Sequence, residues 1–162
     1  MKVIGLDPGL ANTGFGIVEG SSSHIKGYRF GTIRTKNDTP IAGRLHHIYK
    51  ELLILFDAEK PDLIIVEDIF SLGRYPRSAI ILGKISGIIL LAGYHQDVSI
   101  VELPSRKVKQ ILTGNGNADK HQVERAIRHL LVRDGPIVPS HASDALGLAL
   151  IGLFRYDHVM HQ

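Results

Sequence analysis

The sequence predicts an α/β protein in which a five-stranded mixed sheet is sandwiched by helices. Two observations predict this class. Three alternating apolar segments with short connections open the chain, which favours an antiparallel start of the sheet. Helical segments and short apolar strands then alternate, so the order is βββ-α-β-α-β-α. This order is neither the pure alternation of a doubly wound fold nor an all-β pattern.

The first three strands are predicted from alternation and turn residues. Lys2–Asp7 and Thr13–Glu19 form a hairpin-like pair joined by the turn Asp7-Pro8-Gly9. Ser23–Thr35 alternates more loosely and is expected to be the third strand. Pro40 then begins a helix, whose apolar residues recur at helical spacing (Ile41, Leu45, Ile48, Leu52, Leu55).

The second half of the chain supplies the remaining elements. Pro61-Asp62 ends the first helix, and the apolar run Leu63–Val66, which ends in Glu67, is typical of a strand buried on both faces. The later segments are a helix from about Arg77 to His95, a strand at Val98–Leu103, helices at Ser105–Leu112 and Asp119–Val132, and a last helix from Ser140. This is the element order of the ribonuclease H-like fold. We expect one domain over residues 1–156 and a frayed tail over residues 157–162.

Composition narrows the class of protein. The 162 residues contain no cysteine, which excludes disulfides and cysteine-based zinc sites and fits a reducing compartment, most simply the cytoplasm. The N-terminus lacks the apolar run of a signal peptide. The most apolar segment, Ser78–Tyr94, is interrupted by Lys84, and we expect it to be too short to span a membrane.

Basic residues are unevenly distributed along a chain of net charge +3. Arg74 and Arg77 flank Tyr75, and a second basic group runs from Arg106 to Arg133 (Arg106, Lys107, Lys109, Lys120, Arg125, Arg128, Arg133). Charge runs often form solvated faces only. Two basic groups around an acidic centre nevertheless favour a polyanionic partner.

That acidic centre consists of three carboxylates beside apolar runs: Asp7, Glu67 and Asp144. Each alone has an ordinary explanation, as a turn residue, a strand end or a first-turn helix residue. Together they converge if the two strands are neighbours and the last helix covers them. Their mutual repulsion would raise their pKa values. Divalent cations with hard oxygen ligands, Mg²⁺ or Mn²⁺, would relieve it, and two such ions can promote phosphodiester hydrolysis.

His141 stands three residues before Asp144, so both project from one helical face. We interpret His141 as a metal ligand or as a residue that positions water. Asp68 points to the opposite face of the strand from Glu67 and is left out. Gly9, Gly14 and Gly16 are expected to keep side chains away from metal and phosphodiester.

The chain resembles the bacterial Holliday-junction resolvases of the RuvC type. The resemblance rests on motifs in order along nearly the whole chain: Gly5–Gly9 with Thr13-Gly14, Ile33–Thr35, Val66–Phe70, Val108–Gln110, Thr113–Gly116, Ala118–Lys120 with Gln122-Val123, and Asp144–Leu146. It implies that Asp7, Glu67, His141 and Asp144 are the catalytic and metal-binding positions, with two Mg²⁺ per site. Many members carry Asp where this chain has His141. A neutral imidazole makes Mn²⁺ a suitable substitute.

The resemblance also implies a substrate and partners. Lys109 and Lys120 match lysines that contact phosphate, and Phe70 matches an aromatic that stacks on an unpaired junction base. The ordinary alternative for Phe70 is a core residue. Arg74 and Arg77 are further candidates for DNA contact. Such enzymes are homodimers that nick two strands of like polarity in a four-way DNA junction, leaving 5′-phosphates, and they act with a branch-migration helicase complex in recombination and repair.

The residues themselves also suggest a dimer. The helix segment 79–93 is apolar nearly all round, so it is either fully buried or packed between the sheet and a twofold mate.

Three other functions are weighed against a junction resolvase. They are a YqgF-type ribonuclease H-like nuclease acting on RNA, an actin-like nucleotide-binding protein, and a junction-binding module without catalysis. The first should lack the Phe70 region and the Lys109/Lys120 pair, the second needs another domain, and the third needs a broken acid cluster.

Overall fold

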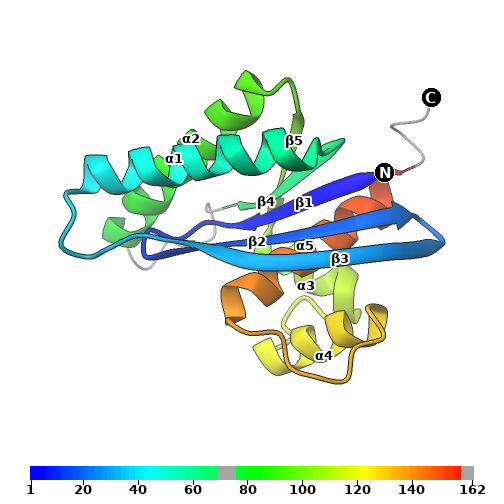
Figure 1. Cartoon of the computed structure of the whole chain (residues 1–162). Coiled ribbons are helices and arrows are strands. Elements are labelled where there is room, and N and C mark those ends of the chain that lie inside the picture. Colours follow the sequence, from blue (N-terminus) through cyan, green and yellow to red (C-terminus); the bar gives the residue numbers. More distant parts are fainter. Residues whose placement is uncertain (69–75, 158–162) are drawn as a thin grey trace.

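The computed structural model describes residues 1–68 and 76–157. The strands are β1 (Lys2–Asp7), β2 (Asn12–Ser21), β3 (His24–Arg34), β4 (Leu63–Asp68) and β5 (Ser99–Pro104), and the helices are α1 (Ile41–Glu59), α2 (Pro76–His95), α3 (Ser105–Thr113), α4 (Lys120–Leu130) and α5 (Ser140–Tyr156). The strand order is β3-β2-β1-β4-β5 (Figure 1). β3, β2 and β1 pair antiparallel, whereas β1, β4 and β5 pair parallel. The predicted mixed sheet is confirmed.

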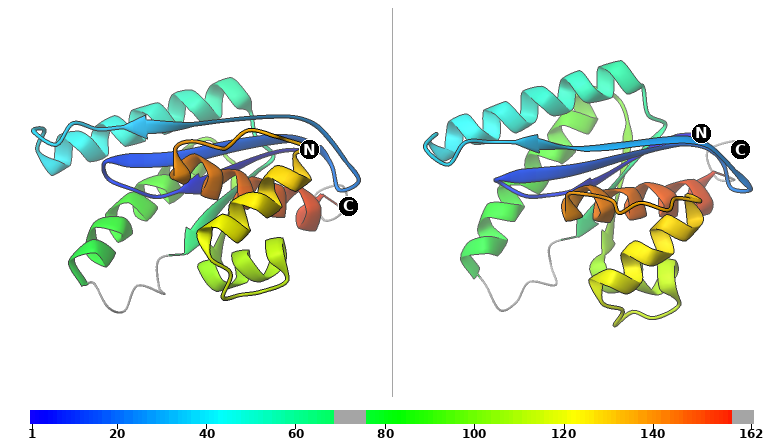
Figure 2. Two further views of the ribbon diagram at one scale, coloured as in Figure 1. Left: turned by 90° about the horizontal axis from the view of Figure 1, so that it is seen from below. Right: turned by 60° about the horizontal axis from the view of Figure 1, so that its bottom comes forward.

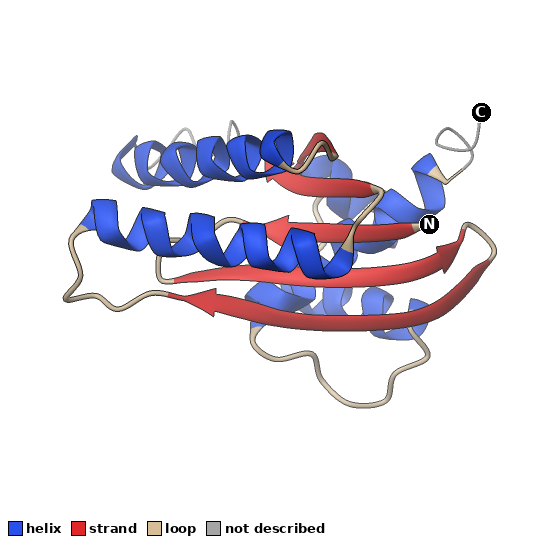
Figure 3. Ribbon diagram, turned by 45° about the horizontal axis from the view of Figure 1, so that its top comes forward, coloured by secondary structure: helices blue, strands red, loops and turns tan. Residues whose placement is uncertain are grey.

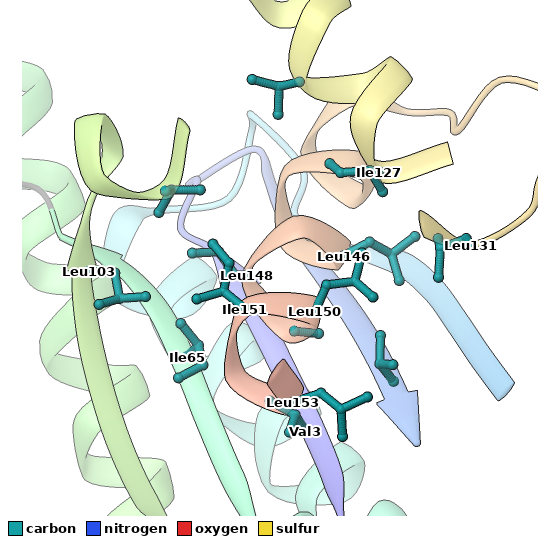
Figure 4. Packing of buried hydrophobic residues seen from close by; sticks show 14 of the residues in the cluster. Val3, Ile65, Leu103, Ile127, Leu131, Leu146, Leu148, Leu150, Ile151 and Leu153 are labelled. Carbon is teal, nitrogen blue, oxygen red and sulfur yellow. The ribbon is translucent and has the colours of Figure 1, made fainter. Parts of the chain in front are cut away.

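Alternation along the strands divides the core into two layers. Val3 of β1 packs toward α5, whereas its neighbours Ile4 and Leu6 belong to the cluster formed with α1 and α2. The helices α1 and α2 therefore cover one face of the sheet, and α5, α3 and α4 cover the other (Figures 2 and 3). Figure 4 shows Leu148 and Ile151 of α5 packed near Ile65 of β4. A sheet buried on both faces explains the near-continuous apolar runs of β1 and β4.

Glycines let α5 lie unusually close to the sheet. A Cβ added at Gly5 would stand 2.0 Å from the Ala145 carbonyl oxygen, and one added at Gly14 would stand 2.1 Å from that of His141. A Cβ at Gly16 would stand 2.5 Å from the Leu146 amide nitrogen. The expectation that Gly14 and Gly16 make room for metal and substrate is corrected: they make room for the backbone of α5.

The helix α2 differs from its sequence-based description. By length and composition alone its stretch Arg77–His95 is long and apolar enough to cross a membrane, so the expectation that it is too short is wrong. In this fold the helix lies against the sheet, with Ile85, Ile89 and Ala92 fully buried. Only 28% of the stretch is buried within the chain, so α2 is not a fully buried core helix.

Two helix ends also differ from the predictions. α4 ends at Leu130, two residues early, and Val132 adopts a left-handed backbone with φ of 49°. Asp157, expected in a frayed tail, is 7% exposed, and its Oδ2 accepts a 2.9 Å hydrogen bond from the Ser22 amide. The rest of the expected tail lies outside the described residues.

Candidate active site

Two neighbouring parallel strands carry carboxylates to the same edge of the sheet. Leu6 of β1 pairs with Val66 of β4, so Asp7 and Glu67 occupy the next positions of the two strands. Both lie two residues beyond positions that face α5, Gly5 and Ile65. Their side chains therefore turn to the face that α5 covers. The first turns of α5 bring His141 and Asp144 to this edge.

These side chains line one groove, which has a volume of about 270 Å³. We call it the acidic groove; its walls are Asp7, Glu67, Ser105, Val108, Lys109, Lys120, Val123, His141, Asp144 and Leu148. All four residues predicted as catalytic, and both predicted lysines, therefore come together. They are contributed by β1, β4, α3, α4 and α5, which are far apart in the sequence.

A short polar contact in the acidic groove joins Asp7 and His141. The Nδ1 atom of His141 lies 2.5 Å from Oδ2 of Asp7. When Asp7 is ionised its carboxylate accepts this hydrogen bond from Nδ1–H. In the neutral tautomer that carries this Nδ1–H, the other ring nitrogen, Nε2, has the lone pair and can act as an acceptor or a metal ligand. The Asp7 side chain is 11% exposed, and that of His141 is 41% exposed.

Burial raises the pKa of all three carboxyl groups. The pKa of Asp7 rises to about 6, chiefly by desolvation, although the hydrogen bond and charge of His141 act in the opposite direction. Desolvation likewise raises the pKa of Glu67 and Asp144. For Asp144 the main opposing influence is Lys120, whose Nζ lies 3.9 Å from Oδ2. In the groove the effect of burial on these carboxyl groups therefore outweighs that of the nearby positive charges, a pattern common at functional sites.

The donor set fits a hard divalent cation. Three carboxylates and one imidazole supply oxygen and borderline nitrogen ligands, which suit Mg²⁺ and Mn²⁺. Over residues 1–68 and 76–157, no three His, Cys, Asp or Glu side chains already converge tightly enough to enclose an ion. The acidic groove is thus a set of converging donors rather than a closed cage.

Ser105 is a groove residue that sequence reasoning missed. Its side chain hydrogen-bonds Glu67 and lowers the pKa of that carboxyl, in opposition to burial. β5 pairs parallel with β4, and Leu103 and Pro104 stand opposite Glu67 and Asp68. Ser105 follows at once, as the first residue of α3. The available signal was a hydroxyl residue directly after a strand that ends beside Glu67.

The other predicted site residues fall into two groups. Lys109 and Lys120 lie in the acidic groove, and both lower the pKa values of Glu67 and Asp144. Arg77 is exposed on the first turn of α2 and does not line the groove. Phe70, Arg74 and Tyr75 lie outside the described residues. Asp68 is not among the groove residues, as strand alternation predicted.

The fold and the groove together define the class of protein. A mixed five-stranded sheet with this helix arrangement, and with carboxylates of β1, β4 and α5 at one edge, is that of a ribonuclease H-like nuclease. The family model of the crossover junction endodeoxyribonuclease RuvC matches residues 3–152. The chain belongs to the RuvC family of crossover junction endodeoxyribonucleases, and its enzyme class is that of a Holliday junction resolvase.

Individual relatives are similar to this chain in sequence and structure over its full length. The crossover junction endodeoxyribonuclease RuvC of Caldicellulosiruptor saccharolyticus is 34% identical over 163 residues, spanning 100% of this chain and 98% of the relative. The solved structure of Thermus thermophilus RuvC has a TM-score of 0.85 at 30% identity and covers 98% and 96% of the two chains. T. thermophilus RuvC in complex with Holliday junction substrate has a TM-score of 0.88 at 28% identity, with 99% and 97% coverage. Membership of this family decides against the YqgF-type and actin-like alternatives.

Proposed function

We propose that the chain resolves four-way DNA junctions by metal-dependent hydrolysis, making paired nicks at symmetric positions in two strands of like polarity. The products would be nicked duplexes with 5′-phosphate and 3′-hydroxyl ends. The observation that carries this proposal is the convergence of Asp7, Glu67 and Asp144, from three elements, in a groove flanked by Lys109 and Lys120. A similar chain, T. thermophilus RuvC, has been solved in complex with Holliday junction substrate, which supports the same ligand for this chain.

The residues of the acidic groove would have different roles in this reaction. Asp7, Glu67, Asp144 and His141 would hold two Mg²⁺ or Mn²⁺ ions, which in such sites activate water and stabilise the leaving oxygen. Asp7 orients the imidazole of His141 through the 2.5 Å hydrogen bond. Lys109 and Lys120 supply positive charge for the phosphates that flank the cleaved bond. The apolar walls formed by Val108, Val123 and Leu148 restrict water around the reacting phosphate.

Paired nicking requires two copies of the groove, and α2 offers a surface for a homodimer. Its sheet-facing side is buried, whereas Ile80, Leu91 and Tyr94 are 61%, 48% and 81% exposed. Apolar side chains on one helix, rimmed by polar residues, are suited to a twofold interface with the same helix of a second copy. Two grooves related by a twofold axis match the symmetry of a four-way junction.

Further parts of the proposal extend the family resemblance. Phe70 would stack on an unpaired junction base, and Arg74 and Arg77 would contact the DNA backbone. A branch-migration helicase complex would act with the enzyme in recombination and repair. The proposed compartment is the cytoplasm, where bacterial chromosomal DNA is found.

The test is incubation of the protein with a mobile four-way DNA junction in Mg²⁺ or Mn²⁺, with cuts mapped on all four strands. The expected result is two symmetric cuts in strands of like polarity, carrying 5′-phosphates. Asp7→Asn is the control and should bind the junction without cutting it. Cutting of single strands at unrelated positions, or undiminished cutting by Asp7→Asn, would contradict the proposal.

A further inference from the structure

A second pocket at the junction of β3 and α1 has no role in the chemistry described above. It has a volume of about 270 Å³, and we call it the basic pocket. Its walls are Thr35, Lys36, Thr39, Gly43, Arg44 and His47. The absence of a side chain at Gly43 keeps the pocket open, because a Cβ there would stand 3.0 Å from the Thr39 methyl group. No acidic residue is among the residues that line it.

Arg44 is the best-placed group of the basic pocket. It is half-buried, and its Nε donates a 2.7 Å hydrogen bond to Thr35 Oγ1. Within the described part of the chain its two Nη groups have no hydrogen-bond or ion-pair partner. A guanidinium held at Nε, with both Nη groups available, presents paired donors for the oxygens of a phosphate.

Lys36 and His47 add positive charge and a hydrogen-bond donor to those of Arg44. Lys36 is exposed, and it too has no ion-pair partner among the described residues, so its charge adds to that of Arg44. His47 contributes a further ring donor from the next turn of α1. Asp38 lies in the same connection, where its Oδ1 accepts a 3.4 Å hydrogen bond from Thr39, but it does not line the pocket. Lys36 and Arg44 therefore bring two positive charges to the residues that form the pocket and no carboxylate is among these residues, although most of the exposed wall is hydrocarbon.

The basic pocket lies at the same edge of the sheet as the acidic groove. Arg34, at the end of β3, pairs with Asn12 at the start of β2, and Gly14 of β2 pairs with Asp7. In Figure 1 the turn from β1 to β2 and the connection from β3 to α1 lie at the same end of the molecule. Thr35 joins the two regions, because its Oγ1 donates a 2.5 Å hydrogen bond to the Leu10 carbonyl and its amide donates to Ala11.

We propose that the basic pocket binds a backbone phosphate of the junction DNA, away from the cleaved bond. The inference rests on the proposed function, because it takes a four-way DNA junction as the ligand. The two sites lie at the same end of the sheet, and the phosphates of a nucleic acid are the groups that paired guanidinium and ammonium donors recognise. The hydrogen bonds from Arg44 through Thr35 to Leu10 connect the bound phosphate to the turn that follows Asp7.

The experiment measures junction affinity without divalent metal, so that no strand is cut, over a series of salt concentrations. The variants are Lys36→Gln and Arg44→Gln. Lys26→Gln is the matched control, because it removes the same charge from an exposed position near the opposite end of β3. We expect each pocket variant to weaken binding roughly threefold to tenfold and to reduce the log–log salt slope by about 0.9, as loss of one phosphate contact does. Lys26→Gln should change neither.

If Arg44→Gln unfolds, Lys36→Gln alone tests the phosphate-binding proposal. We expect Lys36→Gln to fold, because no hydrogen bond among the described residues depends on the Lys36 side chain. Pocket variants that match Lys26→Gln in affinity and salt slope would overturn the inference. In that case the unmodified protein would still bind and cut the junction. Failure of the proposed function has a different signature, because the unmodified protein itself would then fail to cut the junction in Mg²⁺ or Mn²⁺, whatever the affinities of the pocket variants.

Discussion

His141 at the start of α5 and Asp7 at the end of β1 share a hydrogen bond of 2.5 Å, although they are separated by 134 positions in the chain. This contact joins the helix that covers the sheet to the strand at its centre. It also lowers the pKa of Asp7, so the imidazole partly offsets the larger effect of burying this carboxylate.

The raised pKa of Asp7 predicts a pH-dependent stability. Burial raises the pKa of Asp7 to about 6 in the native protein, from the ordinary value of 3.8 in the unfolded chain. The native state therefore binds more protons between these values, and the free energy of unfolding falls as pH rises through this window. Above about pH 6.5, Asp7→Asn should be more stable than the unmodified protein by about 1–3 kcal/mol. Below pH 4 the difference should disappear.

Urea unfolding of both proteins at several pH values between 4 and 8 measures this effect without any substrate. A constant difference across the range would mean that Asp7 titrates normally. The same substitution should abolish cutting, since Asn cannot supply the anionic oxygens that a divalent cation needs.

Metal binding should be visible as stabilisation of the protein without DNA. Mg²⁺ or Mn²⁺ that binds only the folded state raises the free energy of unfolding, by about 2.7 kcal/mol when the free ion is at 100 times its dissociation constant. We expect this rise in the unmodified protein above pH 6.5 and its loss in Asp144→Asn. Thermal unfolding with and without each ion is the measurement. An equal rise in Asp144→Asn would place the ion elsewhere.

The close approach of α5 to the sheet predicts that Gly14→Ala is strongly destabilising. The new Cβ would stand 2.1 Å from the His141 carbonyl oxygen, so α5 would have to move away from β2 and carry His141 with it. We expect a loss of at least about 2 kcal/mol together with loss of cutting. Gly27→Ala on β3 is the matched control, because nothing lies within 4 Å of its Cβ position. Similar unfolding midpoints for the two variants would refute this account of α5.

The exposed side of α2 predicts a dimer that a single charge disrupts. Leu91→Lys should shift the protein to monomer, because a charged side chain would be buried at the proposed twofold interface. Ile54→Lys is the control, since Ile54 of α1 is 60% exposed on a different helix. Light scattering gives the mass, and junction cleavage then shows whether the two cuts remain paired. A dimeric Leu91→Lys protein would rule out this surface.

Local patterns in the sequence were sufficient for the order of elements and for much of the acidic groove. Alternation along β1 and β4 put Asp7 and Glu67 on strand ends, and the three-residue spacing put His141 and Asp144 on one face of a helix. Such periodicities depend on neighbouring residues, so they can be read without the fold. The motif resemblance then indicated that the separate pieces belong to one site.

Other features required the tertiary structure. Only the sheet register brings Ser105 beside Glu67, and only the packing of α5 shows that Gly14 and Gly16 receive its backbone rather than a substrate. The apolar residues of α2 looked alike in the sequence, yet the sheet covers one side and leaves Ile80, Leu91 and Tyr94 exposed. The hydrogen bond between Asp7 and His141 also depends on the packing of α5 against the sheet. Each depends on surfaces that meet from distant parts of the chain, and no local periodicity records which surfaces meet.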